Sequence, residues 1–534
     1  MMSLAAALSA CGGGGGSSPA PAPVPPAPAP APTAAVAALS APADGQFAWD
    51  VAQPAAVTLT DAGGHVVAAS ATTCAAHDAS QLTVSADCSQ VTALRVGDLA
   101  IDVSGGGASA SLVVHGVPQR HWSGAHGVSR YAALTVATDG SVASWGDNDS
   151  GILDQDASNA TLPFLAVATP AKNAAGTTWA GVMQASMGQL AGAVLLNDGT
   201  AQAWGDDGFH ELANTVSNGN NVALVPVPVL DMTSRASLQH VVQIELGDEN
   251  AIALIDDGTV LSWGDYTGNG TSGESLPPVQ TVGVDGVTPL SHVSAVSAGW
   301  NFGLALTDDG RVLSWGFDPG AGALGQGPSA GQVARTPGYV VRADGTPLDG
   351  IVQISAGYNF GLALASDGSV WAWGSNAEGQ LGRGTTGGSS TVAVQVQAGG
   401  GNLSRIAMVA AGGWHALALD LDGRVLAWGD DGEGQLGDGA GAPVSNYTGV
   451  PHVTVAESGS VAGFTDIVSI AASYSDSFAL GRDGRVLSWG RNFNGALGRT
   501  TAGASDRTPA PVTTAAGTLA LTASAYPNLL RRAR

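Results

Sequence analysis

The chain has 534 residues, of which 44% are hydrophobic, 77 are glycine and 12% are charged. Its formal net charge is −24, from 19 basic and 43 acidic residues, and Lys172 is its one lysine. Binding to nucleic-acid phosphates needs clustered Lys and Arg, so the composition argues against a nucleic-acid partner. The many glycines and few charges favour short strands joined by tight turns over long solvated helices.

The first eleven residues form a short apolar run that ends in a cysteine. The letters Leu8-Ser9-Ala10-Cys11 resemble the lipobox of bacterial lipoproteins, in which the signal is cleaved before the cysteine and the thiol then carries diacylglycerol. The resemblance implies a signal peptide over residues 1–10 and a lipid anchor at Cys11. No Lys or Arg precedes the run. Two alternatives therefore remain open. The true start of the protein lies further upstream, or the segment is an Ala-rich disordered start with an unmodified Cys11 thiol.

Residues 11–37 are rich in glycine and then in proline and alanine. A segment of this composition cannot bury a core, so we expect a disordered, extended linker. No apolar stretch reaches the roughly eighteen residues that a transmembrane helix needs. We therefore expect membrane attachment through the lipidated Cys11, in the bacterial cell envelope at the outer membrane, facing either the periplasm or the outside.

Residues 38–116 alternate strand-like runs with Gly, Asp and Ser turns, which predicts a small β-sandwich-like domain. Cys74 and Cys88 lie in this domain, 14 positions apart. Outside the cytoplasm we expect them to form a disulfide that adds on the order of 3 kcal/mol to stability. Two buried thiols are the alternative.

A segment of the form DG-x4-WG recurs seven times in the second part of the chain. The copies occupy residues 139–146, 198–205, 257–264, 309–316, 367–374, 422–429 and 483–490. Successive copies are 52 to 61 residues apart, a period that suits one four-stranded propeller blade and is too long for helical hairpins. Asp-Gly between two apolar strands also favours a tight β-hairpin, because both residues tolerate positive φ.

Several copies have a strand and an Ala-Gly corner before them, as in residues 293–300, and a Gly-Gln-Leu-Gly loop after them, as in residues 376–384. The pattern AGxxxxxAL…DGxVxxWGxNxxGQLG resembles the repeat of the regulator of chromosome condensation family, whose members fold as seven-bladed β-propellers. The resemblance covers about residues 120–515. The family's histidine after the corner is kept at His415, and the third copy has YTGNGTSG in place of the loop.

The resemblance implies an all-β chain with a seven-bladed propeller over residues 120–523 and a tail over residues 524–534. We expect the tryptophan of each copy to fill a seam between blades; an aromatic ligand ring is the alternative. These residues are Trp145, Trp204, Trp263, Trp315, Trp373, Trp428 and Trp489. Residues 507–523 contain an outer-strand pattern without a blade of their own, so we expect them to complete the first blade and close the ring.

Acidic residues collect in the loops after the Trp-Gly pairs, where they form a candidate partner-binding rim; solvated turns are the alternative. The rim consists of Asp147, Asp149, Asp206, Asp207, Asp265, Asp318, Glu378, Asp430, Asp431 and Glu433. Aromatic residues near the corners, namely Trp300, Tyr358 and Trp414, form a second group of candidates.

The motifs H-E-x-x-H, C-x-x-C and the P-loop do not occur in the sequence, and the G-x-S-x-G letters at residues 327–331 lack the strand and helix of a nucleophile elbow. We therefore expect no catalytic activity, metal or cofactor. The predicted function is that of a monomeric, lipid-anchored propeller that binds an unidentified protein of the cell envelope as a scaffold or inhibitor-like module. Nucleotide exchange on a small GTPase, by family analogy, and a polysaccharide-active enzyme are the alternatives.

Overall fold

The computed structural model describes most of the chain after residue 34. The described residues are 35–41, 46–48, 52–94, 97–117, 132–137, 139–148, 151–153, 163–214, 222–231, 233–272, 275–328, 331–439, 447–454, 466–501 and 503–521. The predicted signal peptide, Cys11, most of the linker, Asp149 and the tail lie outside them. Within these ranges the structure is almost entirely β, and its two short 3-10 helices are η1 (Ala69–Ala71) and η3 (Phe493–Gly495). The described part of the chain has no helix that is long and apolar enough to span a membrane.

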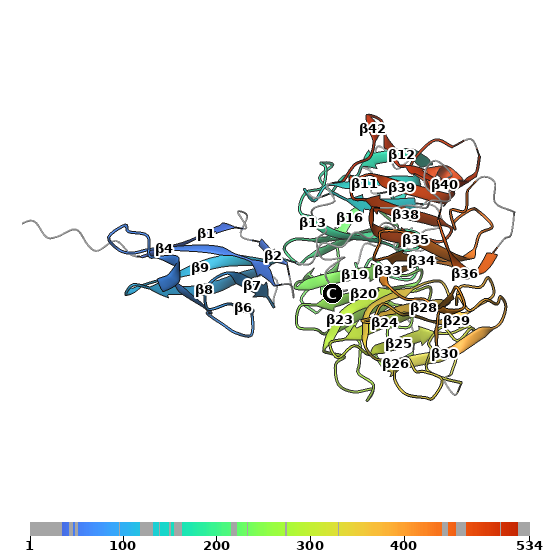
Figure 1. The fold of residues 1–534 in the computed structure, drawn as a ribbon, viewed down its shortest axis with the longest axis horizontal. Coiled ribbons are helices and arrows are strands. Elements are labelled where there is room, and N and C mark those ends of the chain that lie inside the picture. Colours follow the sequence, from blue (N-terminus) through green and yellow to red (C-terminus); the bar gives the residue numbers. More distant parts are fainter. Residues whose placement is uncertain are drawn as a thin grey trace, which may run out of the picture.

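The N-terminal strands form three small sheets, among the described residues, with the orders β2-β9-β8-β5, β3-β7-β6 and β1-β4 (Figure 1). Their bounds are β1 (Val36–Ala41), β2 (Gln46–Ala48), β3 (Gln53–Pro54), β4 (Ala56–Thr60), β5 (Thr73–Ala76), β6 (Leu82–Val84), β7 (Gln90–Ala93), β8 (Gly97–Gly105) and β9 (Ala108–Val117). One apolar core joins the sheets and includes Leu59, Val91 and Val114. Cys74 and Cys88 are buried in this core and form a disulfide, as the sequence predicts.

Seven further sheets follow in chain order within the described residues, and each contains one copy of the repeated segment (Figure 1). The first sheet consists of β10 (Ala132–Val136), β11 (Val142–Asp147) and β12 (Phe164–Pro170), with β41 (Thr513–Thr514) and β42 (Gly517–Thr518) at its outer edge. The second and third sheets are β13 (Val182–Met187), β14 (Ala191–Leu196), β15 (Ala201–Asp206) and β16 (Val222–Pro228), then β19 (Val241–Leu246), β20 (Asn250–Ile255), β21 (Val260–Gly264) and β22 (Ser275–Gln280). The fourth and fifth are β23 (Val293–Ala298), β24 (Phe302–Thr307), β25 (Val312–Phe317) and β26 (Val333–Tyr339), then β27 (Ile351–Ala356), β28 (Phe360–Ala365), β29 (Val370–Ser375) and β30 (Ser389–Gln395). The sixth and seventh are β33 (Ile406–Ala411), β34 (His415–Asp420), β35 (Val425–Asp430) and β36 (Tyr447–Val453), then β37 (Ile467–Ala472), β38 (Asp476–Gly481), β39 (Val486–Arg491) and β40 (Ser505–Pro511).

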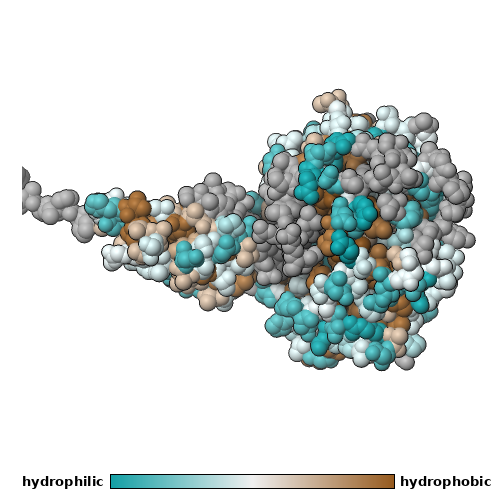
Figure 2. Space-filling view, viewed as in Figure 1, coloured by the Kyte–Doolittle hydropathy of each residue, from teal (hydrophilic) through white to brown (hydrophobic). Residues whose placement is uncertain are grey.

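Two short hairpins lie between these sheets in the chain. They are β17 (Leu230–Asp231) with β18 (Ala236–Ser237), and β31 (Gln397–Ala398) with β32 (Gly401–Asn402). In each of the second to seventh sheets the four strands run antiparallel in simple chain order, as in the blades of a propeller. In Figure 2 the surface of the propeller shows hydrophilic residues with hydrophobic ones between them.

The ring closes through packing of the last sheet on the first. Trp145 of the first sheet lies edge-on to Phe478 of the seventh, with 6.1 Å between ring centroids. Its indole also donates a hydrogen bond to the carbonyl oxygen of Ala496, 351 residues later in the chain. The two ends of the repeat array therefore share one buried core, which also contains Val512 and Leu521.

The predicted role of the C-terminal segment is wrong for its main strand. β40 pairs with β39 and completes the seventh sheet, because the outer strand of each sheet follows its own copy of the repeat. A single parallel pairing, between Thr514 and Ala168, connects the segment with the first sheet. The prediction is therefore wrong for β40, whereas β41 and β42 join the outer edge of the first sheet as the sequence predicts.

Side chains on the innermost strands tie neighbouring sheets together. The amide of Gln184 donates to the carbonyl oxygen of Ile244 in the next sheet at 2.9 Å and accepts from the Ile244 N–H at 3.0 Å. The same two-bond contact joins Gln243 with Val296 and Gln353 with Val409, at 2.8 to 3.1 Å. Each of these amides satisfies the main chain of its neighbour, so the centre of the ring is held by directional bonds as well as by apolar packing.

Candidate functional site

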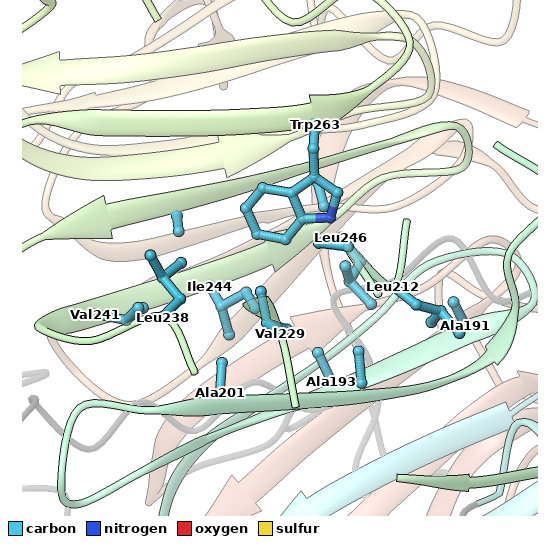
Figure 3. Close-up of a cluster of buried hydrophobic side chains, with 14 of the residues drawn as sticks. Ala191, Ala193, Ala201, Leu212, Val229, Leu238, Val241, Ile244, Leu246 and Trp263 are labelled. Carbon is cyan, nitrogen blue, oxygen red and sulfur yellow. The ribbon is translucent and has the colours of Figure 1, made fainter. Parts of the chain in front are cut away.

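The seven repeat tryptophans lie in the seams between sheets, each with an exposed fraction of 1% or less. Figure 3 shows Trp263 of the third sheet among side chains of the second and third sheets, including Leu212 and Leu246. A small residue lies beneath several of the rings. A Cβ at Gly192 would lie 2.7 Å from Cζ2 of Trp204, and a Cβ at Gly361 would lie 2.3 Å from Cζ2 of Trp373. These two indole rings therefore fit only because the residue that faces them has no side chain.

Six of the seven indole N–H groups donate to a main-chain carbonyl in the loop of the preceding sheet, at 2.7 to 2.9 Å. The acceptors, in the order of the tryptophans, are Ala496, Ile152, Glu211, Ala323, Gln380 and Gln435. Trp315 follows the atypical third copy, and its ring lies instead against Gly268. The burial and the bonds assign the indoles to seams between sheets, with their rings turned away from solvent.

The loops after the Trp-Gly pairs are held by a polar side chain at one fixed position. The side chains of Asn148, Asp207, Asn376, Asp431 and Asn492 each accept the main-chain N–H five residues later, at 3.0 to 3.1 Å. Asp318 accepts three consecutive loop N–H groups at 2.7 to 3.0 Å. These carboxylates of the predicted rim are nearly buried and serve the turn, as an Asn does in other copies.

The remaining rim residues are half-buried and lie beside the corners of the sheets. Asp265 and Asp430, which directly follow a Trp-Gly pair, donate their main-chain N–H to the carbonyl oxygens of Glu249 and Trp414 at 2.7 and 2.9 Å. Corners and loops therefore lie on one face of the ring, and the Asp-Gly hairpins lie on the opposite face. The other half-buried rim residues are Asp147, Asp206, Glu378 and Glu433.

The corners between the first and second strands meet around the centre of this face. Main-chain bonds of 3.2 to 3.3 Å run from Asp248 to Trp300, from Tyr358 to Gly413 and from Gly413 to Tyr474, each between neighbouring sheets. A Cβ at Gly247 would lie 2.3 Å from the carbonyl oxygen of the next corner. The glycine of the Ala-Gly corner is thus required by the close approach of adjacent sheets.

Four aromatic side chains form a continuous array along these corners, and we name Trp300, Tyr358, Trp414 and Tyr474 the aromatic arc. Trp300 stacks on Tyr358 with a centroid distance of 4.4 Å and an angle of 10°. Trp414 lies 5.2 Å from Tyr358 and 4.4 Å from Tyr474. All four are half-buried. The first three are candidates from the sequence. Tyr474 is missed there because Ser473 replaces its corner glycine, although it has the same place in its copy as Trp300 and Tyr358, whereas Trp414 lies one position later.

His415, the family-like histidine beside the arc, is a core residue. It is fully buried, and its Nε2 lies 2.9 Å from the hydroxyl of Ser477 in the seventh sheet. Burial lowers the pKa of His415 to about 3. The imidazole is therefore neutral at physiological pH and bridges the sixth and seventh sheets, which is a structural role.

Models of the regulator of chromosome condensation (RCC1) repeat match the chain. One matches residues 293–319, 351–380, 406–435 and 467–496. Another matches residues 367–419 and 483–524. The matched ranges contain the repeat copies of the fourth to seventh sheets.

The chain is also similar in sequence to curated proteins, among them the following three. The chain is 32% identical over 262 residues to the RCC1 domain-containing protein RUG3, mitochondrial, of Arabidopsis thaliana (48% of this chain, 55% of the relative). It is 30% identical over 266 residues to the probable E3 ubiquitin-protein ligase HERC6 of Homo sapiens (48% and 24%), and 27% identical over 305 residues to the ultraviolet-B receptor UVR8 of A. thaliana (55% and 61%). The chain thus spans less than two thirds of each of these relatives.

Solved structures show the same fold. Prp20p from Saccharomyces cerevisiae superposes with a TM-score of 0.57 at 19% identity, covering 70% of this chain and 85% of Prp20p. Human WBSCR16 superposes with a TM-score of 0.55 at 22% identity, covering 70% and 95%. Together with the repeat copies, the seam tryptophans and the corner glycines, these matches show that the chain carries RCC1 repeats and folds as a β-propeller of the regulator of chromosome condensation type.

Proposed function

We propose that this protein is a lipid-anchored, extracytoplasmic propeller that binds another protein through the face that carries the aromatic arc. The observation that carries the proposal is the arc itself. Large aromatic side chains that remain half-exposed on a rigid framework are typical of the energetic centre of protein interfaces. The corner bonds and the inner-strand glutamines hold the arc in place before any partner arrives, which limits the entropy lost on binding.

A structural neighbour supports binding as the role of such a propeller. Prp20p from S. cerevisiae has binding properties toward Gsp1p and histones. At 19% identity the likeness to Prp20p concerns the fold, so the partner of this chain follows from its own surface and not from that of Prp20p. The described residues contain no group of three or more side chains suited to hold a metal ion.

The location rests on two features of the N-terminal part. The lipobox-like letters end at Cys11, and the neighbouring domain carries the Cys74–Cys88 disulfide. Structural disulfides persist in oxidising compartments such as the periplasm or the cell surface. Both features favour an envelope protein that is tethered through its N-terminal segment.

Photo-crosslinking in cells tests the proposed face. A benzophenone amino acid replaces Glu378, in a loop on the face of the arc, or Asp198, in an Asp-Gly hairpin on the opposite face. We expect an adduct of higher mass in the envelope fraction from position 378 and none from position 198. The absence of an adduct from both positions, or equal adducts from both, contradicts the proposal.

A further inference from the structure

The surroundings of the aromatic arc indicate what chemistry it recognises. We propose that the arc receives arginine or lysine side chains presented by a loop of the partner protein. This inference rests on the proposed function, which states only that the face binds a protein. It adds the kind of side chain that enters the site and the forces that hold it there.

Carboxylates flank the arc at both ends. At the first end, Asp248 is bonded through its main chain to Trp300, and the adjacent Glu249 is bonded to Asp265. Towards the second end, which is Tyr474, the main-chain N–H of Asp430 is bonded to the carbonyl oxygen of Trp414. Glu433 follows in the same loop and pairs with Arg491. Asp248 is buried, whereas Glu249, Asp265, Asp430 and Glu433 are half-buried. These four carboxylates remain partly exposed, in a chain with a net charge of −24. A potential of this sign attracts cationic groups and repels anionic ones.

Aromatic rings and carboxylates act on a cation in the same direction. The face of an indole or phenol ring carries a negative quadrupole, and a guanidinium or ammonium group within about 6 Å of the ring centre is attracted to it. The arc offers two indoles and two phenols beside the carboxylates. A neutral sugar can stack on the rings and donate hydroxyl hydrogen bonds to the carboxylates, but only a cation is also attracted by the net negative charge. The combination therefore favours a cation.

The protein already holds one guanidinium in this manner at the second end of the arc. The Arg491 guanidinium carbon lies 5.2 Å from the centre of the Phe493 ring, and its Nε lies 3.8 Å from a carboxylate oxygen of Glu433. The main-chain N–H of Arg491 is bonded to Ser475, next to Tyr474. This internal arginine shows that the loops of this face accommodate the aromatic–cation–carboxylate arrangement that we assign to the partner.

Calorimetry with defined peptides tests the inference on the full chain. The probe is the peptide Gly-Ser-Arg-Arg-Arg-Ser-Gly, and its matched control carries neutral citrulline in place of each arginine. We expect the arginine peptide to bind roughly tenfold or more tightly than the citrulline peptide, and to weaken as NaCl rises from about 50 to about 500 mM, because salt screens the carboxylates.

Three double variants locate the binding site. Trp300→Leu with Trp414→Leu keeps apolar bulk at the corners but removes both indoles, and we expect it to weaken the arginine peptide roughly 5- to 30-fold. Asp430→Asn with Glu433→Gln removes two carboxylates beside the arc. Its matched control, Asp198→Asn with Asp257→Asn, removes two carboxylates from the opposite face. We expect the control on the opposite face to bind the arginine peptide like the unaltered chain, and the variant beside the arc to bind it more weakly.

Three results overturn the inference. They are equal affinity for the arginine and citrulline peptides, no binding of either peptide, and Trp300- and Trp414-dependent binding of the neutral oligosaccharide maltohexaose in place of the peptide. These results leave the crosslinking experiment untouched, because that experiment detects any protein on this face. An adduct from position 378 without a preference for arginine therefore refutes the cationic partner and keeps the protein-binding proposal.

Discussion

His415 of the sixth sheet lies 2.9 Å from the hydroxyl of Ser477 in the seventh sheet, through its Nε2. Ser477 in turn donates to the carbonyl oxygen of Gln435 at 2.8 Å, so the imidazole supplies the proton of the first bond. The indole of Trp489 donates to the same carbonyl oxygen at 2.9 Å. One seam of the propeller is therefore joined by a polar chain that crosses from one repeat into the next.

The first prediction concerns the coupling of these two residues. His415→Phe introduces the phenylalanine that the fourth and fifth copies have at this position. Ser477→Ala introduces the alanine that the sixth copy has at the position of Ser477. We expect Ser477→Ala alone to cost about 1–3 kcal/mol, because it leaves a buried imidazole N–H without an acceptor. The double variant should cost less than the sum of the two single variants. Urea unfolding of the four proteins measures the coupling, and strictly additive costs would contradict the bond.

The second prediction concerns acid stability. The pKa of His415 lies near 3 in the folded chain because the ring is buried, whereas an unfolded histidine titrates near 6.5. The unfolded chain therefore binds more protons between these values, so the contribution of neutral His415 is complete above about pH 6.5 and is lost as the pH falls. His415→Phe should reduce the loss of stability between about pH 7.5 and pH 5 by about 2 kcal/mol. An identical pH dependence in both proteins would show that the ring protonates while folded.

The third prediction concerns a buried carboxyl group at a position where other copies have glutamine. Burial raises the pKa of Glu211 to about 8, and its Oε2 accepts the N–H of Phe209 at 3.1 Å. Gln380 and Gln435 make the same bond with an amide oxygen in their loops, at 2.9 Å. Because the folded pKa of Glu211 is raised, the contribution of its protonated form to the free energy of unfolding is fully present below the unfolded pKa, near 4.5. It decreases as the pH rises toward 8.

Glu211→Gln keeps the acceptor and removes the titration. At about pH 8 we expect the free energy of unfolding of the variant to exceed that of the unaltered chain by about 2 kcal/mol or more. This difference should shrink toward pH 5. The reverse change Gln435→Glu is the matched control and should introduce the same slope into another loop. Guanidinium unfolding across this pH range measures both, and a constant offset in place of a slope speaks against a buried acid.

The fourth prediction compares two seam tryptophans. Trp263 donates its indole N–H to Glu211, and among the described residues Trp315 makes no such bond. Replacement by Phe removes a similar volume from both seams. We expect Trp263→Phe to lower the free energy of unfolding by about 2–4 kcal/mol. Trp315→Phe should cost about 1 kcal/mol less, since no hydrogen bond is lost. Thermal or urea unfolding of the pair decides, and an equal or larger cost for Trp315→Phe argues against a contribution from the indole bond.

The fifth prediction concerns the lipid anchor. Growth with an alkyne-bearing fatty acid should label the unaltered protein, and Cys11→Ser should abolish the label, because the acyl chain is carried by this thiol. Cys74→Ser serves as the control, since it removes another cysteine and leaves Cys11 in place. Equal labelling of the unaltered chain and the Cys11→Ser protein would show that the lipobox resemblance is accidental.

The repeat and its hairpins could be predicted from the sequence because their causes are local. Asp-Gly forms the turn of the repeated hairpin, and Gly140 and Gly310 have φ of 77° and 78° in two of these hairpins. The spacing of the copies predicts one sheet per copy, and their shared tryptophan predicts the filling of the seams. The acidic rim shows the limit of such reasoning. Asp207 and Asp431 read as surface charges, although Asn148 and Asn376 at the same position already indicate a role in the turn.

What the sequence determined by itself is thus the unit: strands, turns and the residues that each copy shares, all set by interactions within a few residues. Which sheet takes the C-terminal strand, and which side chains meet around the axis, was decided only by tertiary structure. The letters of residues 505–511 suit the edge of either the first or the seventh sheet, and the closed ring selects β39 as their partner. The aromatic arc likewise exists only because adjacent corners, more than fifty residues apart in the chain, approach closely enough to share main-chain hydrogen bonds.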